Sequence, residues 1–274
     1  MTNNYLYIDF DDKTDDSTHQ AKFKVSKTSK IEHLINQKDY EKALTHIDKI
    51  LENDKDFSNW NLKGIILNNL KEYEKSIECF DNALSLCDCQ EIRLNKAKCL
   101  YDFSKVTFFP EGNYDKSLIL IDDALDILPE SEDPSEFYFL KAEILEGMEN
   151  LVEAQKAYLM AYNEFDRLKE LENQIDYLNN TSDILIIIAG TGFYNFTPKS
   201  GIVVDLIRDL ENEHDPDAIA VFFNEKIAGY VANSDYTLIE EVKSASDIKK
   251  SINENQKAEI LFDFLGEYTV ARLI

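Results

Sequence analysis

The sequence has no apolar run long enough to cross a membrane. Its longest, Ile184 to Ala189, is far shorter than the about 20 residues that a bilayer requires. Met1 to Asp12 lack the basic region and apolar core of a signal peptide. Positive charge is scarce too, since 29 Lys and Arg stand against 53 Asp and Glu, a net charge of −24. An acidic surface repels nucleic acid and anionic membrane, so we expect no membrane binding. Because a signal peptide and a membrane-spanning run are both missing, we expect the protein to be cytoplasmic.

The motifs of common enzyme classes are also missing. The glycine-rich stretch Ala189 to Gly192 is not followed by the Lys and Ser or Thr of a phosphate-binding loop. Neither GxSxG nor HExxH occurs. The four histidines are scattered, at His19, His33, His46 and His214. We therefore expect no catalytic site and no cofactor.

Cysteine is sparse, with only Cys79, Cys87, Cys89 and Cys99. A disulfide framework is unusual in a cytoplasmic chain of this size. The Cys-x-Cys spacing also differs from the Cys-x₂-Cys of most zinc sites. We expect reduced, half-buried thiols on helices and no metal site.

A helical pattern recurs four times between residues 24 and 162. An aromatic residue or leucine is followed, at offsets of three, seven and ten, by a small, a bulky and a further apolar residue. These offsets lie on one face of a helix. The pattern starts at Tyr40, Tyr73, Tyr114 and Leu151. It predicts helix pairs that must stack to bury their apolar faces.

The pattern resembles the tetratricopeptide repeat (TPR), a helix–turn–helix unit of about 34 residues. Trp60 and Gly64 precede Tyr73, and Leu128-Pro129 ends the third unit, as in that repeat. We expect residues 24–180 to form an α-solenoid of such pairs, closed by a long capping helix from Tyr162 to Leu178.

The TPR resemblance implies a peptide-binding groove lined by the first helix of each unit. The positions that align with this groove are Asn61, Asn68, Asn95, Asp102, Phe139, Glu143 and Glu146. They include no cation to hold an acidic peptide end, which favours a neutral or basic peptide of a protein partner. The alternative is that these side chains are only a solvated polar face.

Two segments depart from the repeat. Residues 1–23 contain two short alternating stretches around an acidic stretch, and form either a β-hairpin or a disordered acidic arm. Lys105 to Gly112 lengthens the third unit by an apolar loop with Phe108-Phe109-Pro110. That loop either packs back on the array or offers a contact to a partner.

Residues 183–274 have a different texture. Six short stretches are rich in β-branched and aromatic residues, and Leu265-Gly266-Glu267 indicates a hairpin. Ser234 and Ser244 indicate the starts of two short helices. A small β-barrel is the expected fold, so the whole chain is expected to be an α+β multidomain protein.

This stretch resembles the HIRAN domain, an OB/SH3-like barrel. The matching blocks are Gly190 to Tyr194, Leu206 to Asp209, Asn212 to Val221, Gly229 to Ser234 and Val270 to Ile274. The resemblance implies a binding domain. Members that sit in front of remodelling helicases grip the 3′ end of single-stranded DNA, with an aromatic ring stacked on the last bases.

Carried over by alignment, the stacking ring is Phe193, the second ring is His214, and the acceptor of the 3′ hydroxyl is Asp215. Gly192 and Asn233 stand where the family has phosphate-binding cations. The candidate DNA-binding residues are Phe193, Tyr194, Asn212, His214, Asp215, Tyr230 and Asn233. Alternatively, Asn212 to Pro216 is only a turn in which Asp215 accepts backbone hydrogen bonds.

Two functions therefore remain open. In the first, the chain is a non-enzymatic adaptor whose repeats hold a protein partner and whose barrel holds a single-stranded DNA 3′ end. In the second, it is purely a protein–protein assembly factor, and the barrel does not bind DNA.

Overall fold

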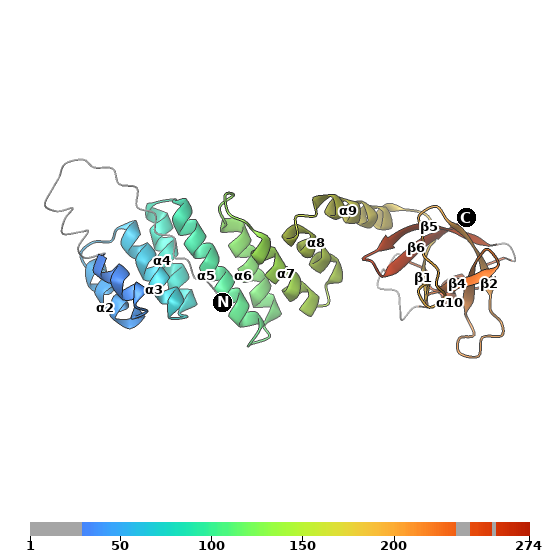
Figure 1. Ribbon diagram of the computed structural model, residues 1–274, viewed down its shortest axis with the longest axis horizontal. Helices are drawn as coiled ribbons and strands as arrows, with labels where there is room; N and C mark the ends of the chain where they lie inside the picture. The colour runs from blue at the N-terminus through green and yellow to red at the C-terminus, as the bar shows by residue number, and fades with distance from the viewer. Residues whose placement is uncertain (1–28, 234–241, 254–255) are drawn as a thin grey trace. The chain divides into compact units, whose positions relative to one another are not determined.

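The computed structural model describes residues 29–233, 242–253 and 256–274 (Figure 1). The described chain forms two compact units, one ending at Asn163 and one spanning Glu164–Ile274. The predicted N-terminal arm, residues 1–23, and the predicted helix start at Ser234 lie outside the described residues. None of the helices in the described ranges is long and apolar enough to cross a membrane.

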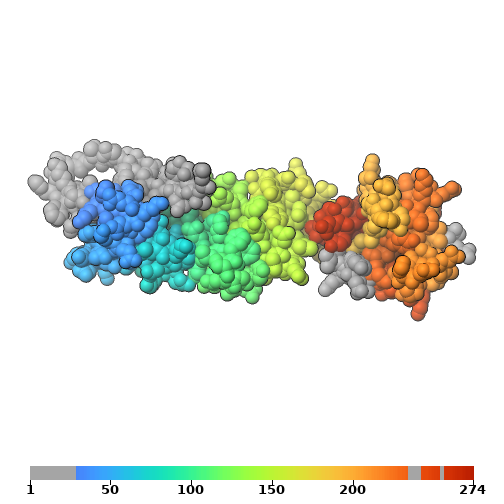
Figure 2. All heavy atoms as spheres, turned by 60° about the horizontal axis from the view of Figure 1, so that its bottom comes forward, coloured from blue at the N-terminus to red at the C-terminus, as the bar shows by residue number. Residues whose placement is uncertain are grey.

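The first unit is a row of helices that pack in chain order (Figure 1). In Figure 2 its successive helices form adjacent bands of colour from blue to yellow-green. A helical segment covers residues 29–36. It is followed by α2 (Tyr40–Leu51), α3 (Phe57–Asn69), α4 (Tyr73–Leu86), α5 (Gln90–Phe108), α6 (Tyr114–Ile127), α7 (Ser135–Gly147) and α8 (Leu151–Ala161).

The second helix of each pair begins at the predicted residue, and the local sequence explains why. In α2, α6 and α8 the residue before the helix is Asp39, Asn113 or Asn150, whose side chain accepts a hydrogen bond from the third helical N–H. Such caps satisfy backbone donors that a helix start leaves unpaired. The position before each cap is a left-handed residue in all four repeats, at Lys38, Lys71, Gly112 and Glu149.

The small positions of the repeat are buried as predicted. Ala43, Ser76 and Ser117 have no exposed surface, and Ala154 is only 3% exposed. Ser76 Oγ donates a hydrogen bond of 2.7 Å to the carbonyl of Gly64 in the paired helix. A hydroxyl at this position therefore fills the same space as alanine and also satisfies its own polar group.

One ion pair recurs between successive repeats. Lys63 on α3 pairs with Asp48 at 2.8 Å, Lys96 on α5 with Asp81 at 2.5 Å, and Lys141 on α7 with Asp122 at 2.7 Å. Exposed pairs of this kind contribute about 0–1 kcal/mol each. They therefore contribute little to the stability of the array.

The predicted apolar loop of the third unit is partly helical. α5 continues to Phe108, whose ring contacts those of Phe109 and Tyr114 at centroid distances of 4.6 and 5.7 Å. Thr107 is buried and receives a hydrogen bond from Ser117. Phe109 is 59% exposed, so the segment packs back through Phe108 and leaves one ring in solvent.

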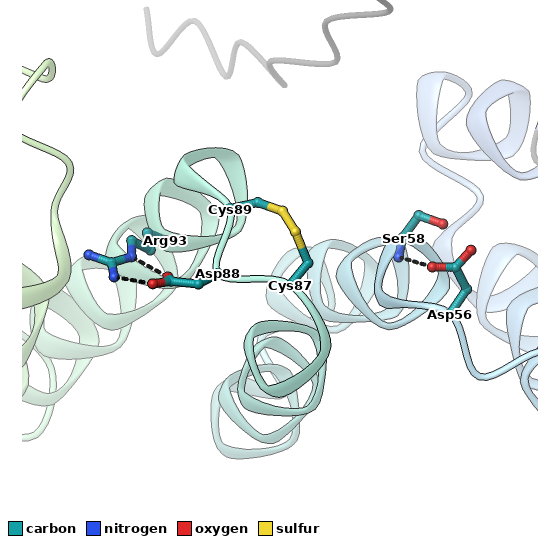
Figure 3. The surroundings of a disulfide bond; sticks show 6 residues. All are labelled: Asp56, Ser58, Cys87, Asp88, Cys89 and Arg93. Atoms are coloured by element: carbon teal, nitrogen blue, oxygen red, sulfur yellow. Dashed lines mark hydrogen bonds and ion pairs between the residues drawn. A yellow bond between two sulfur atoms is a disulfide. The ribbon is translucent and has the colours of Figure 1, made fainter.

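The cysteines fall into two classes. Cys79 and Cys99 are buried free thiols, and burial raises their pKa values to about 11 and about 12. Cys87 and Cys89 form a disulfide in the turn before α5, next to an Asp88 carboxylate that binds the Arg93 guanidinium through two hydrogen bonds (Figure 3). The prediction of four reduced thiols is wrong for this pair. Because the closed loop is so short, the chain-entropy account gives the disulfide at most about 1.5 kcal/mol of stabilisation.

The second unit contains a closed antiparallel barrel with the strand order β1-β4-β3-β2-β5-β6. The predicted six-stranded barrel is confirmed by this arrangement. Its elements are α9 (Phe165–Asn180), β1 (Leu185–Ala189), β2 (Val203–Arg208), β3 (Ile219–Phe223), β4 (Lys226–Val231), α10 (Ala245–Ile248), β5 (Lys257–Phe264) and β6 (Tyr268–Leu273).

The two tight hairpins of the barrel are formed by turn residues with left-handed backbone conformations. Asn224 and Glu225 between β3 and β4, and Leu265 and Gly266 between β5 and β6, all have left-handed φ angles. Two left-handed residues in a row match the type I′ turn, whose twist suits a two-residue hairpin. Ser244 is the cap of α10 and forms a capping box with Asp247, as its predicted position at a helix start requires.

The structure groups α9 with the barrel, whereas the sequence analysis assigned this helix to the repeats as a cap. The Tyr177 ring lies 6.1 Å from that of Phe262 on β5. Its hydroxyl donates to Asp183, which also accepts a hydrogen bond from Arg272 on β6. Helical periodicity predicts a buried face but not which partner buries it, and this explains the difference.

Candidate functional site

The predicted groove residues lie on the first helices α3, α5 and α7, and four of them are brought together in pairs. Asn95 Nδ2 donates to Asn61 Oδ1 at 3.1 Å, and Asn68 Nδ2 donates to Asp102 Oδ2 at 3.1 Å. Both pairs join residues 34 positions apart. Adjacent first helices are therefore in register, and they align polar side chains across the helix row.

This polar row is more buried than a solvated face would be. Asn61 is only 8% exposed. Burial raises the pKa of Asp102, an effect that the hydrogen bond from Asn68 opposes. Asn68 Oδ1 is buried and accepts no hydrogen bond from any residue that the structure describes. A buried acceptor of this kind costs about 1–3 kcal/mol unless water or a ligand donates to it, so the row retains hydrogen-bonding capacity.

The remaining predicted groove residues, Phe139, Glu143 and Glu146, lie around Tyr158 on α8. Tyr158 was not predicted as a site residue. The Phe139 ring on α7 lies 5.5 Å from the ring of Tyr158 on α8. The Tyr158 hydroxyl donates a 2.8 Å hydrogen bond to Glu146. Burial, together with Glu146 and Glu143, raises the pKa of Tyr158, so this hydroxyl remains a donor at neutral pH.

The repeat pattern places Tyr158 at its bulky position and the predicted capping helix starts at Tyr162, so neither was predicted as a site residue. The Tyr162 ring lies 6.0 Å from that of Phe139. The sequence does contain one signal that sets Tyr158 apart. The equivalent bulky positions in the earlier repeats are Ile47, Phe80 and Ile121. A tyrosine at such a position carries a hydroxyl that needs a polar partner, and here the partner is Glu146.

Three of the predicted aromatic residues of the barrel, Phe193, Tyr194 and Tyr230, contact one another in a row through edge-to-face and tilted ring contacts. Phe193 is 82% exposed, and its ring lies 5.0 Å from that of Tyr194. Tyr194 in turn lies 6.0 Å from Tyr230 on β4. The turn that carries the first two rings starts at Gly190, which has a φ of +75°. Phe193 is thus exposed to solvent at the end of this row of rings.

The predicted polar residues of the barrel form hydrogen bonds within the loop between β2 and β3. Asn212 Oδ1 accepts hydrogen bonds from the backbone N–H groups of His214 and Asp215, each at 3.0 Å. Asp215 accepts from the backbone N–H of Asp217 at 2.8 Å and from Asn233 Nδ2 at 3.3 Å. Both carboxylate oxygens of Asp215 therefore have partners within the fold, which is the arrangement expected of the turn interpretation.

Asp209 links the two groups of barrel residues and was not predicted as a site residue. It accepts hydrogen bonds from Tyr230 Oη at 3.0 Å and from Asn212 Nδ2 at 3.3 Å. Burial and this carboxylate raise the pKa of Tyr230 to about 12. Asp209 immediately follows β2, a position that sequence inspection alone did not single out.

Electrostatics around the barrel do not favour phosphate. Residues 183–274 include eight Lys or Arg and sixteen Asp or Glu. Three of these cations, Lys249, Lys257 and Arg272, pair with carboxylates of the barrel itself. A separate pocket on the barrel wall contains none of the predicted residues and is lined by Asp205, Leu206, Ile207, Phe222, Glu225, Gln256 and Lys257.

Comparison with known proteins assigns part of the helical unit. The tetratricopeptide repeat family model matches residues 57–88, which contain α3 and α4. The match covers one helix pair, and the other pairs of the first unit repeat its pattern, so this unit is an array of TPR-like helix pairs. The match does not extend to the barrel, so the HIRAN resemblance stays a prediction.

Among solved structures, the crystal structure of MamA matches with a TM-score of 0.37 and 16% identity, over 51% of this chain and 77% of that one. The structure described as MamA RS-1 ArsTM double mutant matches with a TM-score of 0.38 and 18% identity, over 50% of this chain and 72% of that one. No curated protein matches the sequence.

Proposed function

We propose that this protein is a non-enzymatic, cytoplasmic adaptor whose TPR array binds an extended segment of a protein partner across α3, α5 and α7. The observation that carries the proposal is the pairing of groove residues between adjacent first helices in 34-residue register. Side-chain amides held in this way offer donors and acceptors to a peptide backbone at a fixed spacing. The unpartnered acceptor of Asn68 adds a site for a backbone N–H.

The charge of the groove favours a neutral or basic segment. Asp102, Glu143 and Glu146 lie along it, and the protein as a whole carries −24. An acidic segment would face repulsion both at a distance and in the groove. Like charges placed opposite one another in an interface oppose binding and so select against the wrong partners.

The groove is tested by selecting peptides from a random library on the full-length protein. The affinity of the tightest-binding peptide is then measured by fluorescence anisotropy. We expect the double variant Asn61→Ala/Asn95→Ala to weaken binding about tenfold. Removing both members of the pair leaves no buried group without its partner, so the fold should be kept. Asn82→Ala on α4, whose amide bonds only to its own helix, is the matched control. Selected peptides that bind the double variant as tightly as the wild type would exclude this groove.

A second candidate function is binding of single-stranded DNA 3′ ends by the barrel, as the HIRAN resemblance implies. The observation that favours it is the 82% exposed ring of Phe193. Stacking on such a ring contributes about 1–3 kcal/mol per base and needs no particular sequence. The internal hydrogen bonds of Asp215 and the shortage of cations favour the alternative, in which the barrel takes part only in protein assembly.

The two possibilities differ in anisotropy measured with thymidine oligonucleotides that end in a 3′ hydroxyl or a 3′ phosphate, at low salt. End binding predicts preference for the free hydroxyl and a loss of about tenfold in affinity for Phe193→Ala. Phe109→Ala in the helical unit, another exposed phenylalanine, should bind like the wild type. If no oligonucleotide binds at micromolar protein, the assembly function is the one that remains.

A further inference from the structure

The last repeat carries a group of side chains that the other repeats lack. It consists of Phe139, Glu143 and Glu146 on α7, with Tyr158 and Tyr162 at the end of α8, and is called the aromatic–acidic cluster below. The Phe139 ring meets those of Tyr158 and Tyr162 at interplanar angles of 74° and 88°. Phe139 is 38% exposed and Tyr162 is 62% exposed. Edge-to-face contacts of this kind leave ring faces open to a ligand.

The carboxylates of the cluster have few partners of their own. Glu146 is oriented by the hydrogen bond from Tyr158, and Glu143 lies near enough to contribute to the raised pKa of the same tyrosine. Among the ion pairs of the described residues, neither glutamate takes part. By contrast, Asp48, Asp81 and Asp122 on the second helices of the first three repeats each pair with a lysine of the following first helix.

This combination selects the charge of a ligand. A cation within about 6 Å of a ring face is attracted by the ring quadrupole, and more strongly where water is excluded. A carboxylate beside it adds a charge-assisted hydrogen bond. An anion would meet two glutamates, and a purely apolar group would desolvate them without compensation. A positively charged side chain is the group that satisfies both components.

We propose that the aromatic–acidic cluster binds the guanidinium or ammonium group of an arginine or lysine in the segment held by the groove. This inference rests on the proposed peptide-binding function and specifies its partner: a basic segment whose cation is anchored at the last repeat. The cluster is formed by α7 and the end of α8, and α7 contacts α5, which carries Asn95 and Asp102 of the polar row. A partner's backbone then pairs with the row while its basic residue reaches the cluster.

The test compares fluorescein-labelled peptides of alternating alanine and arginine with peptides in which citrulline, the uncharged isostere, replaces arginine. On the full-length protein at low salt, the arginine peptide should bind about tenfold more tightly than the citrulline peptide. Glu143→Gln/Glu146→Gln should raise the Kd for the arginine peptide about tenfold and leave that for citrulline unchanged. Phe139→Ala should weaken the arginine peptide, whereas Phe139→Tyr, which keeps a ring face, should not.

A charge-matched control separates the cluster from the general acidity of the protein. Glu52→Gln/Glu78→Gln also removes two negative charges, one at the residue that caps the C-terminal end of α2 and one on α4, and both residues are exposed. If this control weakens the arginine peptide as much as the cluster variant does, the cluster is not the cation site.

Two other results distinguish this inference from the function on which it rests. Arginine-peptide binding that responds to Asn61→Ala/Asn95→Ala but not to the cluster variants overturns the cluster and leaves the groove. Binding of neither arginine nor library-selected peptides overturns both. The fluorescence of Trp60, the single tryptophan, verifies that each variant is folded.

Discussion

Phe80→Ala is expected to lower the free energy of unfolding of the helical unit by about 3–5 kcal/mol, the range for removing a buried aromatic ring. Phe80 lies on α4 and is 1% exposed, in the core cluster shared by α3 to α7. Its ring lies directly on α3, because a Cβ built at Gly64 would come within 2.6 Å of Phe80 Cε1. Helices this close cannot collapse further to fill the space that the ring leaves, so most of the cavity cost remains.

Urea unfolding followed by Trp60 fluorescence measures this loss. Trp60 packs against the same core cluster, so its signal follows the helical unit, and far-UV circular dichroism supplies an independent probe. Phe109→Ala is the control, since this ring is 59% exposed and its removal should cost less than about 1 kcal/mol. Equal losses for the two variants would mean that the Gly64–Phe80 contact does not organise the array.

The second helices could be predicted because several local signals agree at their starts. At Tyr40, Tyr114 and Leu151 a capping Asp or Asn precedes the helix, and the small and bulky positions follow at fixed offsets. Each of these signals acts within a few residues of chain. The alignment to the repeat also placed the groove residues on the first helices, because each first helix directly precedes its second helix in the chain.

Features that depend on contacts between distant segments could not be predicted in this way. The apolar face of α9 is visible in the sequence, but its contact with Phe262 is not. The hydrogen bond from Tyr158 to Glu146 joins two helices whose relative rotation sequence spacing does not fix. For Asp215 the sequence left a ligand role and a turn role open. The hydrogen bond from the Asp217 N–H is the one that the turn interpretation predicts.

Gly229→Ala is expected to destabilise the barrel by about 3 kcal/mol, at the upper end of the usual cost of over-packing. A Cβ at this position would lie 2.5 Å from the carbonyl oxygen of Ala189 on β1 and 3.0 Å from Ile188 Cγ2. The carbonyl cannot retreat easily, because β1 is paired with β6 on its other edge. The β1–β4 seam is held in register by two residue pairs, Ile188 with Val231 and Ala189 with Tyr230.

Amide hydrogen exchange locates the damage, since the seam should open before the rest of the barrel. Faster exchange is expected in β1 and β4, while the urea midpoint reported by Trp60 should not move, because that residue belongs to the other compact unit. Gly192→Ala is the control in the same unit, because a Cβ there meets nothing within 4 Å. Unchanged protection of β1 and β4 in Gly229→Ala would show that the strands can separate by the width of a methyl group.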